Sequence, residues 1–569
     1  MTFKSLTAAL IILVPMALTG CQCEEGEDCL VGEIPGEPQA AVVYPLTQTP
    51  YTALQKTWKP TRLSDSTKAL ITSGELTVYD HEHFHEHGIG VEEAEGTPWL
   101  EHQELAPDFV EGEPAQRKSL AYFWIVADPQ VIDEESPIRM ENFDKVYRPQ
   151  GHYTPQVFEA HVRTAERLSQ LSSRRFDFAL LAGDLTDGGQ KNEVDWLLTT
   201  MNGGIINPDS GVDNDPVPGP GNDHNDPFIS DGLSAPWFAA LGNHDSLYNG
   251  GFGTVTQQLR NAATGDHLYI SPIFGLLGWH GYIPGDDTRD SRDTVITNPA
   301  VKTPPDPHRY PLTINEIIDE LYNAGGTPQG HGFTPNDASE GKGYFSYRPS
   351  PEKPIRLIVL HTTDSHEVDI TLAFEGSMDQ IQFNWLQEQL TLAEQNQELV
   401  IIMSHHRLSD FHRKSEVHPS TIEALFLAHK NIALHVTGHG HKNTKTLHSA
   451  FEHGGYWELM TASTMDFPMQ SRIVEIVDEG NDFISIYVTN VDHNSPENSM
   501  SHKARHLAAG KNAFTLAPFF SVQPEFLWRE DVPSQNLLLR TKVSAGTLEN
   551  IRKYEWSNSV ESEEILKTL

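Results

Sequence analysis

The feature that most constrains the fold is a series of short, almost wholly apolar runs that alternate with helical patterns. Residues 122–127 read Tyr-Phe-Trp-Ile-Val-Ala, and residues 178–182 read Phe-Ala-Leu-Leu-Ala. Such runs are typical of strands that are buried on both faces of a sheet. Because strands alternate with helices, the pattern predicts an α/β core. We expect strands at 122–127, 178–182, 237–241, 355–360, 399–404 and 432–437, shorter strands at 456–460, 472–477 and 483–488, and helices at 154–172, 192–201, 379–395 and 420–430.

Five of these strands are followed at once by a loop that carries Asp, Asn, Gln or His. Carboxylate, amide and imidazole groups are ligands that suit zinc, iron or manganese. Active sites of open α/β sheets gather at the carboxyl ends of the strands. We therefore expect one site, built by the loops at 127–130 (ADPQ), 183–188 (GDLTDG), 242–245 (GNHD), 404–406 (SHH) and 438–441 (GHGH).

In this order, the five loops resemble the calcineurin-like metallophosphoesterase superfamily, whose pattern reads D-x-H, G-D-x-x-D, G-N-H-D/E, H and G-H-x-H. The resemblance extends over residues 119–490. It implies an α/β fold in which a two-sheet β-sandwich is flanked by helices, here with large loop inserts. It also implies a binuclear metal centre at the strand ends.

The resemblance assigns a metal-binding role to one residue after another. Asp184 would bridge two ions, and the full set of implied ligands is Asp128, Gln130, Asp184, Asn243, His405, His439 and His441. Asp128, Gln130 and His441 would complete one site, and Asn243, His405 and His439 the other. Gln130 departs from the common pattern, which has histidine there. Its amide oxygen would shift that site toward a harder ion such as Mn²⁺, or leave the site weakly occupied.

Three further residues receive roles by the same resemblance. His244 would be a proton donor or charge stabiliser beside the scissile phosphate, and Asp187 would hold it through a hydrogen bond. Such a carboxylate fixes the tautomer and orientation of an imidazole. His406 would lie behind the ligands or contact the phosphate. A hydroxide held between the two metals would attack the phosphorus, because paired ions lower the pKa of bound water.

We therefore expect an enzyme, a hydrolase of phosphoric mono- or diesters or of nucleotide anhydrides. Its cofactors would be two divalent or trivalent ions (Mn, Fe or Zn), and its partner a small phosphorylated substrate. The alternative is a degenerate relative that binds phosphorylated ligands without turnover, which only Gln130 favours. The formal net charge of −39 argues against a nucleic-acid-binding surface and against electrostatic docking on anionic lipid.

The N-terminus predicts export. Lys4 precedes an apolar stretch that ends in small residues, as in a signal peptide. The sequence Leu-Thr-Gly-Cys that ends at Cys21 resembles a bacterial lipoprotein signal. By that resemblance Cys21 carries lipid and anchors the protein in the cell envelope, on the periplasmic face of the outer membrane or at the cell surface. The alternative is an ordinary secretory signal. Cys23 and Cys29 could form a disulfide; a zinc site is less favoured.

The chain divides by composition into a signal peptide (1–21), a flexible tether (22–50), an N-terminal extension with weak structure (51–115), a catalytic domain (116–495) and a C-terminal extension (496–569). Two inserts interrupt the catalytic domain. The first, 202–235, is rich in Asp and is a solvated loop or, less favoured, a calcium loop. The second, 246–345, is expected to wall the substrate pocket.

Two further segments carry polar residues that draw attention. Four histidines alternate between residues 81 and 87, so an extended strand would place them on one face, for metal capture or as a solvated surface, which we favour. The segment 464–468 (TMDFP) follows the strand at 456–460, and we expect it to pack.

Overall fold

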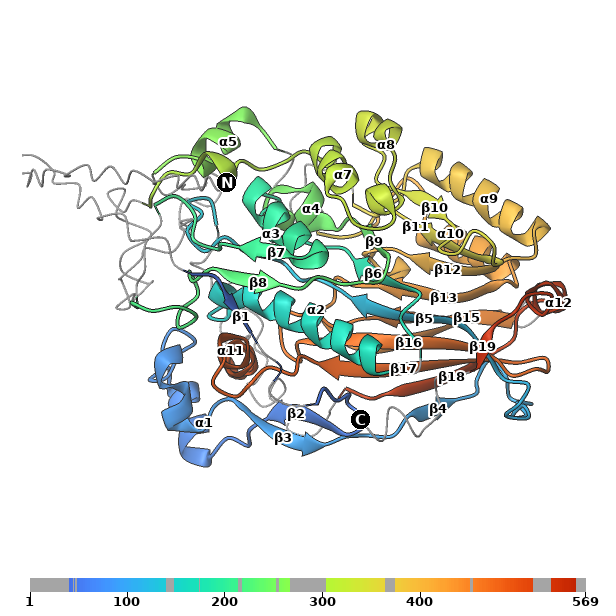
Figure 1. Ribbon diagram of the computed structural model, residues 1–569, viewed down its shortest axis with the longest axis horizontal. Coiled ribbons are helices and arrows are strands. Elements are labelled where there is room, and N and C mark those ends of the chain that lie inside the picture. Colours follow the sequence, from blue (N-terminus) through green and yellow to red (C-terminus); the bar gives the residue numbers. More distant parts are fainter. Residues whose placement is uncertain are drawn as a thin grey trace, which may run out of the picture.

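The computed structural model describes residues 40–558 apart from 45, 47–48, 140–147, 173, 213–216, 252–254, 267–302, 364–373, 451–453 and 515–533. The predictions for the signal peptide, for Cys21 and for the pair Cys23 and Cys29 lie outside the described residues. Two large sheets form the centre of the molecule (Figure 1). In the described part of the chain, no helix has both the length and the apolar character needed to cross a bilayer.

The larger sheet has eight strands. Its neighbours run in the order β4 (Leu100–His102), β18 (Leu537–Thr541), β17 (Ile484–Asp492), β16 (Gln470–Asp478), β5 (Lys118–Val126), β6 (Phe178–Ala182) and β9 (Trp237–Ala240), with β19 (Ser557–Asn558) also paired to β5. The strands β5, β6 and β9 are parallel, so their carboxyl ends meet at one edge.

The second sheet has six strands. Their order is β10 (Phe345–Tyr347), β11 (Ile355–Val359), β12 (Leu399–Met403), β13 (Ile432–Thr437), β15 (Gly454–Met460) and β14 (Thr444–Ala450). The strands β11, β12, β13 and β15 are parallel. All nine strands that the sequence predicts are present, with bounds that differ by a few residues.

The two sheets pack face to face, as the predicted sandwich requires. Successive side chains of β11 alternate between two apolar clusters, since Leu357 and Val359 join the core between the sheets and Ile358 joins the outer cluster. Helices α9 (Gln380–Gln395) and α10 (Pro419–Ala428) cover that outer face. Helices α2 (Thr154–Leu171) and α3 (Lys191–Asn202) pack on the larger sheet. The α/β sandwich flanked by helices is confirmed.

The segments before residue 116 and after residue 495 belong to the same sheet. Strand β4 comes from the N-terminal extension and β18 from the C-terminal extension, and the two pair with each other beside β17. Helix α11 (Met500–Phe514) contributes Ala504 and Leu507 to a cluster with Phe84 and Val157. The sandwich therefore extends beyond the stretch from 116 to 495, and strands far apart in sequence complete it.

The prediction of weak structure over 51–115 is wrong. That stretch forms β2 (Lys56–Pro60), β3 (Val91–Glu95), β4, helix α1 (Asp65–Ser73) and the 3₁₀ helix η1 (His81–His87). Because the four histidines lie in a 3₁₀ helix and not in a strand, they do not share one face. Strand pairing with distant partners stabilises segments whose local pattern is weak.

Structure also reaches into the predicted tether and into both inserts. Strand β1 (Val42–Val43) pairs with β8 (Phe228–Ser230) of the first insert, which also forms β7 (Gly204–Ile206). Asp213 and Asp215 of the suggested calcium loop lie outside the described residues, and Asp226 accepts hydrogen bonds from the backbone N–H groups of two neighbours. The second insert contains α5 (Gln257–Ala263), η5 (Pro307–Arg309), α7 (Ile314–Asn323), η6 (Gln329–Gly332) and α8 (Pro335–Glu340).

Candidate metal centre

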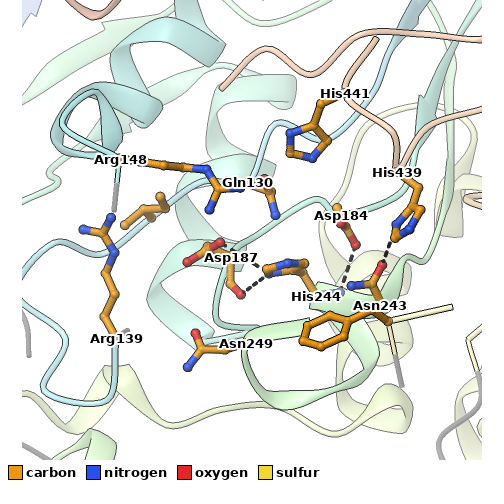
Figure 2. A pocket seen from close by; sticks show the side chains of 12 residues that line it. Gln130, Arg139, Arg148, Asp184, Asp187, Asn243, His244, Asn249, His439 and His441 are labelled. Carbon is orange, nitrogen blue, oxygen red and sulfur yellow. Dashed lines mark hydrogen bonds and ion pairs between the residues drawn. The ribbon is translucent and has the colours of Figure 1, made fainter. Parts of the chain in front are cut away.

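The five polar loops meet at one edge of the sandwich. They leave the carboxyl ends of β5, β6 and β9 in one sheet and of β12 and β13 in the other. The structure brings together every metal ligand and both catalytic residues that the sequence predicts. Figure 2 shows all of them except Asp128 and His405. These are Asp128, Gln130, Asp184, Asp187, Asn243, His244, His405, His439 and His441.

The backbone at this edge is strained at the predicted ligands. Nine non-glycine residues of the described chain have positive φ angles, and five of these are Asp128 (47°), Gln130 (39°), Asp184 (49°), His439 (67°) and His441 (52°). A residue with a Cβ occupies this left-handed region at a cost of about 1–3 kcal/mol. Such conformations persist where the fold holds them, and here they turn the five side chains toward a common point.

Four of the predicted ligands form one half of the centre. The His405 Nε2 atom lies 3.2 Å from Asp184 Oδ2 and 3.1 Å from Asn243 Oδ1, while His439 Nδ1 lies 3.2 Å from the same Asn243 oxygen. The orientation of Asn243 is determined by its Nδ2 group, which donates to Gly250 O at 2.9 Å. The amide oxygen of Asn243 therefore faces the two imidazoles.

The other half contains Asp128, Gln130 and His441. The His441 Nε2 atom lies 3.3 Å from Asp128 Oδ1, and the backbone N–H of His439 donates to the same carboxylate at 3.0 Å. Gln130 is 1% exposed and lines the cavity. Its Oε1 atom is buried without a hydrogen-bond partner in the described structure.

These atoms fit two metal ions. A buried amide oxygen without a partner is costly in a protein interior, and a cation would satisfy it. The carboxylates of Asp128 and Asp184 and the His405 imidazole also have ligand atoms within 4.8 Å of one another, as do His405, His406 and His439. With nitrogen and oxygen donors and no thiolate, the set suits manganese, iron or zinc.

Buried carboxylates raise the pKa of two histidines at the centre, whereas burial and the neighbouring His405 lower that of His439 to about 4. Burial lowers the pKa of His405, but the carboxylates of Asp184 and Asp128 outweigh this and raise it to about 10. Burial also lowers the pKa of His441, but Asp128 and Asp466 outweigh this effect and raise the pKa to about 9. The carboxylates that retain protons on His405 and His441 also attract metal cations, which bind once those protons leave.

The predicted pairing of His244 with Asp187 is visible in the geometry (Figure 2). His244 Nδ1 donates to the backbone O of Asp187 at 2.8 Å and lies 3.3 Å from Asp187 Oδ1. Nδ1 therefore carries the proton, and Nε2 is left for the cavity. Burial lowers the pKa of His244, but Asp184 and Asp187 raise it to about 9. Gly250 passes so close that a Cβ there would lie 2.4 Å from His244 Nε2.

His406 does not line the cavity. It is fully buried, its Nδ1 atom hydrogen-bonds to Thr362 Oγ1 at 2.9 Å, and its Nε2 atom lies 3.2 Å from Phe374 O. The structure thus places it behind the ligands, which is one of the two positions that the sequence left open, and not in contact with the cavity space.

Asp466 belongs to the centre, so the expectation that 464–468 only packs is wrong for this residue. Its Oδ2 atom accepts a hydrogen bond of 2.7 Å from His441 Nδ1. Asp466 also accepts from Arg148, Gln150 and Lys511. A carboxylate on the second nitrogen of a metal-binding histidine orients the ring and increases its basicity. The signal was present, because the segment follows β15 as the ligand loops follow their strands.

A cavity of about 310 Å³ opens on the centre. Beside seven predicted site residues, it is lined by Ile132, Arg139 and Arg148 from the chain that follows β5, and by Phe374. Of the described residues of the second insert, Asn249 lines the cavity. That this insert walls the substrate pocket stays a prediction. The sequence does not single out either arginine, because no motif surrounds them.

The match to a family model agrees with this arrangement. The model of the calcineurin-like phosphoesterase family matches residues 122–443, more than half of the chain. A dimetal phosphatase from Danio rerio is 12% identical over 66% of this chain and 99% of its own, with a TM-score of 0.37. A sulfate thiohydrolase from Thermus thermophilus, solved with glycerol, is 11% identical over 69% of this chain and 60% of its own, with a TM-score of 0.28. Another T. thermophilus protein is 9% identical over 65% of this chain and 94% of its own, with a TM-score of 0.25. None of the curated proteins compared matches the chain.

Proposed function

The chain belongs to the calcineurin-like phosphoesterase family, and from that premise we propose that it is a metal-dependent hydrolase of phosphoric mono- or diesters or of nucleotide anhydrides. The observation that carries the proposal is the convergence of seven ligand side chains from five strand ends. Among them, the Gln130 oxygen is buried and has no hydrogen-bond partner among the described residues. When bound, two metal ions would supply Lewis-acid activation of the phosphoryl group and of the attacking water.

The residues around the predicted metal centre support hydrolysis and not mere binding. His244 presents Nε2 to the cavity with its Nδ1 proton held by Asp187, so it is placed to protonate or stabilise a leaving oxygen. Asn243 and His405 are held in one orientation by Gly250 O and Ala182 O. Such preorganised groups are what distinguishes an active site from a simple phosphate-binding site.

Hydrolysis of p-nitrophenyl phosphate and bis-p-nitrophenyl phosphate tests this function. The purified protein is stripped with a chelator and assayed before and after addition of Mn²⁺, Zn²⁺ or Fe²⁺. We expect turnover that needs metal and that falls at least about a thousandfold in Asp184→Ala. His244→Ala should lose about a hundredfold or more, the usual contribution of a general acid.

The matched control for the lost carboxylate is Asp108→Ala, because Asp108 is an exposed acid that pairs with Lys542 and does not line the cavity. It should retain wild-type rates. If wild-type protein shows no metal-dependent turnover on either ester, or matches Asp184→Ala, the chain is a binding protein and the proposed enzyme activity is wrong.

We also propose that the protein is exported and anchored by lipid on Cys21, facing the periplasm or the exterior. The support is the signal-like sequence of residues 1–21. Mass spectrometry of the mature N-terminus should find an acylated Cys21, and Cys21→Ser should release the protein from the membrane fraction. An unmodified N-terminus upstream or downstream of Cys21 would contradict the anchor.

A further inference from the structure

One wall of the cavity carries two arginines that the metal centre does not use. Arg139 and Arg148 both line the cavity with Asp187 and His244. In Figure 2 the two arginines lie on one side of Asp187 and His244, and Asn243 and His439 lie on the other. The two arginines therefore form a cationic end of the cavity, beside Gln130 and on the far side of His244 from Asn243 and His439.

The guanidinium group of Arg148 is held in place by Asp466. Its Nε atom lies 3.3 Å from both carboxylate oxygens and its Nη2 atom 3.3 Å from Oδ2. The Nη1 atom takes no part in these contacts. Burial opposes a rise in the pKa of Arg148, yet Asp466, Asp187 and Asp184 together raise it, so this cation lies within electrostatic range of the predicted ligand Asp184. The same Asp466 holds His441, so it links the arginine to the metal centre.

Arg139 is held by a second carboxylate. It forms an ion pair with Glu134, and the two side chains are only 6% and 5% exposed. A Cβ at Gly151 would lie 2.5 Å from Arg139 Nη2 and from Glu134 Oε1, so the backbone there closes tightly over the pair. Two guanidinium groups that are fixed before binding lose little side-chain entropy when an anion arrives.

From this arrangement, and resting on the proposed function, we propose that Arg139 and Arg148 bind a second phosphate group of the substrate, on the leaving-group side of the scissile bond. The preferred substrates are then phosphoric anhydrides, in which the leaving group is itself a phosphate. Guanidinium groups match phosphate oxygens in shape and charge. A cavity of about 310 Å³ is at the small end of the range for small-molecule sites, about 300–1,000 Å³.

The chemistry of an anhydride uses both ends of the cavity. Water oxygen forms the new bond to the phosphorus at the metal end, and the bond from that phosphorus to the bridging oxygen breaks. The electron pair stays on the bridging oxygen, which leaves as part of the second phosphate. Its added charge develops beside His244 and the two arginines, and one proton of the water is released or passes to the products. An aryl monoester places no anion at the arginine end.

The test compares ADP with p-nitrophenyl phosphate at saturating Mn²⁺. Arg148→Met, and Arg139→Met combined with Glu134→Gln so that no buried carboxylate is left alone, should each lower kcat/KM for ADP about ten- to a hundredfold more than for the monoester, the range of a charge-assisted hydrogen bond.

The matched control is Lys511→Met. Lys511 also contacts Asp466, at 3.4 Å, but does not line the cavity, so its loss should change both substrates by the same factor. Equal losses on ADP and on the monoester in the arginine variants, or no loss on ADP, would overturn the second phosphate site.

Binding separates this inference from the proposed function. Calorimetry with Mn²⁺-loaded protein should show that methylenediphosphonate, which cannot be hydrolysed, binds about ten- to a hundredfold more tightly than methylphosphonate, and that Arg148→Met abolishes this preference. If no ester is turned over, the enzyme proposal fails while this measurement still decides the arginine site. Equal affinity for the two phosphonates in wild-type protein would contradict the site.

Discussion

Asp466 offers the sharpest test of the metal centre, because it touches His441 without being a predicted ligand. The change Asp466→Asn keeps the shape of the side chain and removes its charge. His441 Nδ1 lies 2.7 Å from Asp466 Oδ2, so the substitution weakens a short, charge-assisted hydrogen bond. Loss of such a partner usually costs about 10–100-fold in metal affinity.

The pH dependence of this loss has a definite sign. Without metal, burial lowers the pKa of His441, but Asp128 and Asp466 outweigh burial and raise it to about 9. Below pH 9 an incoming ion must therefore displace a proton from this ring. Asparagine lowers that pKa and so relieves the competition. The affinity advantage of wild-type protein over Asp466→Asn should therefore be greatest at or above pH 9 and shrink as the pH falls.

Stability should change too. Arg148 and Lys511 both contact Asp466 and are largely buried, with exposed side-chain fractions of 19% and 7%. In Asp466→Asn these two cations lose the carboxylate they share and face a neutral amide. The loss should destabilise the metal-free protein by about 3 kcal/mol. Lys511→Met added to Asp466→Asn should recover part of this loss and none of the metal affinity.

The assay is calorimetric titration of stripped protein with Mn²⁺ at pH 6 and pH 9, with thermal unfolding of the same samples. Lys511→Met alone serves as the control, since it leaves the carboxylate on His441. Equal Mn²⁺ affinity of wild-type protein and Asp466→Asn at pH 9 would refute a role for Asp466 in positioning His441, whatever happens to stability.

Three other predictions concern protons, metal choice and the outer strands. At pH 7, metal binding should release about two protons, because the pKa values of His405 and His441 are about 10 and about 9 without metal. Calorimetric titrations in buffers of different ionisation enthalpy measure the number of protons released, and a value of zero would contradict the prediction. Gln130→His should raise the zinc content that remains after dialysis toward two ions per chain, because imidazole is a stronger ligand for zinc than an amide. Metal analysis of the variant and of wild-type protein checks this, and an unchanged zinc content would place residue 130 outside the centre. Deletion of residues 534–569 removes β18, whose Leu537 and Leu539 are buried in the core, and should lower the free energy of unfolding by at least about 4 kcal/mol. Deletion of residues 559–569 alone should lower it little. Similar denaturant midpoints for the two truncated proteins would show that β18 is dispensable.

The sequence predicts the central part of this fold well because the signal there is local. Strands such as β6 and β13 have the predicted bounds, since a run of five or six apolar residues needs no knowledge of its neighbours to indicate burial. The ligand loops could be found for the same reason: each directly follows its strand, and the parallel ends of β5, β6 and β9 must meet.

The outer strands are different. Strand β4 is short and exposed along much of its length, and it exists because it pairs with β18, more than 400 residues away. The hydrogen bonds that support the metal ligands also join residues far apart in sequence, because Asp466 and Arg148 are separated by 318 positions. No local pattern encodes such a partner.

By itself, the sequence determines which residues can hold metal and in which order the strands present them. Tertiary structure alone decides which charges stand behind the ligands, that the cavity has an arginine end, and that His406 is buried away from it. The physical reason is that a ligand loop follows from a contiguous strand, whereas electrostatic neighbours depend on how two sheets and their distant connections pack together.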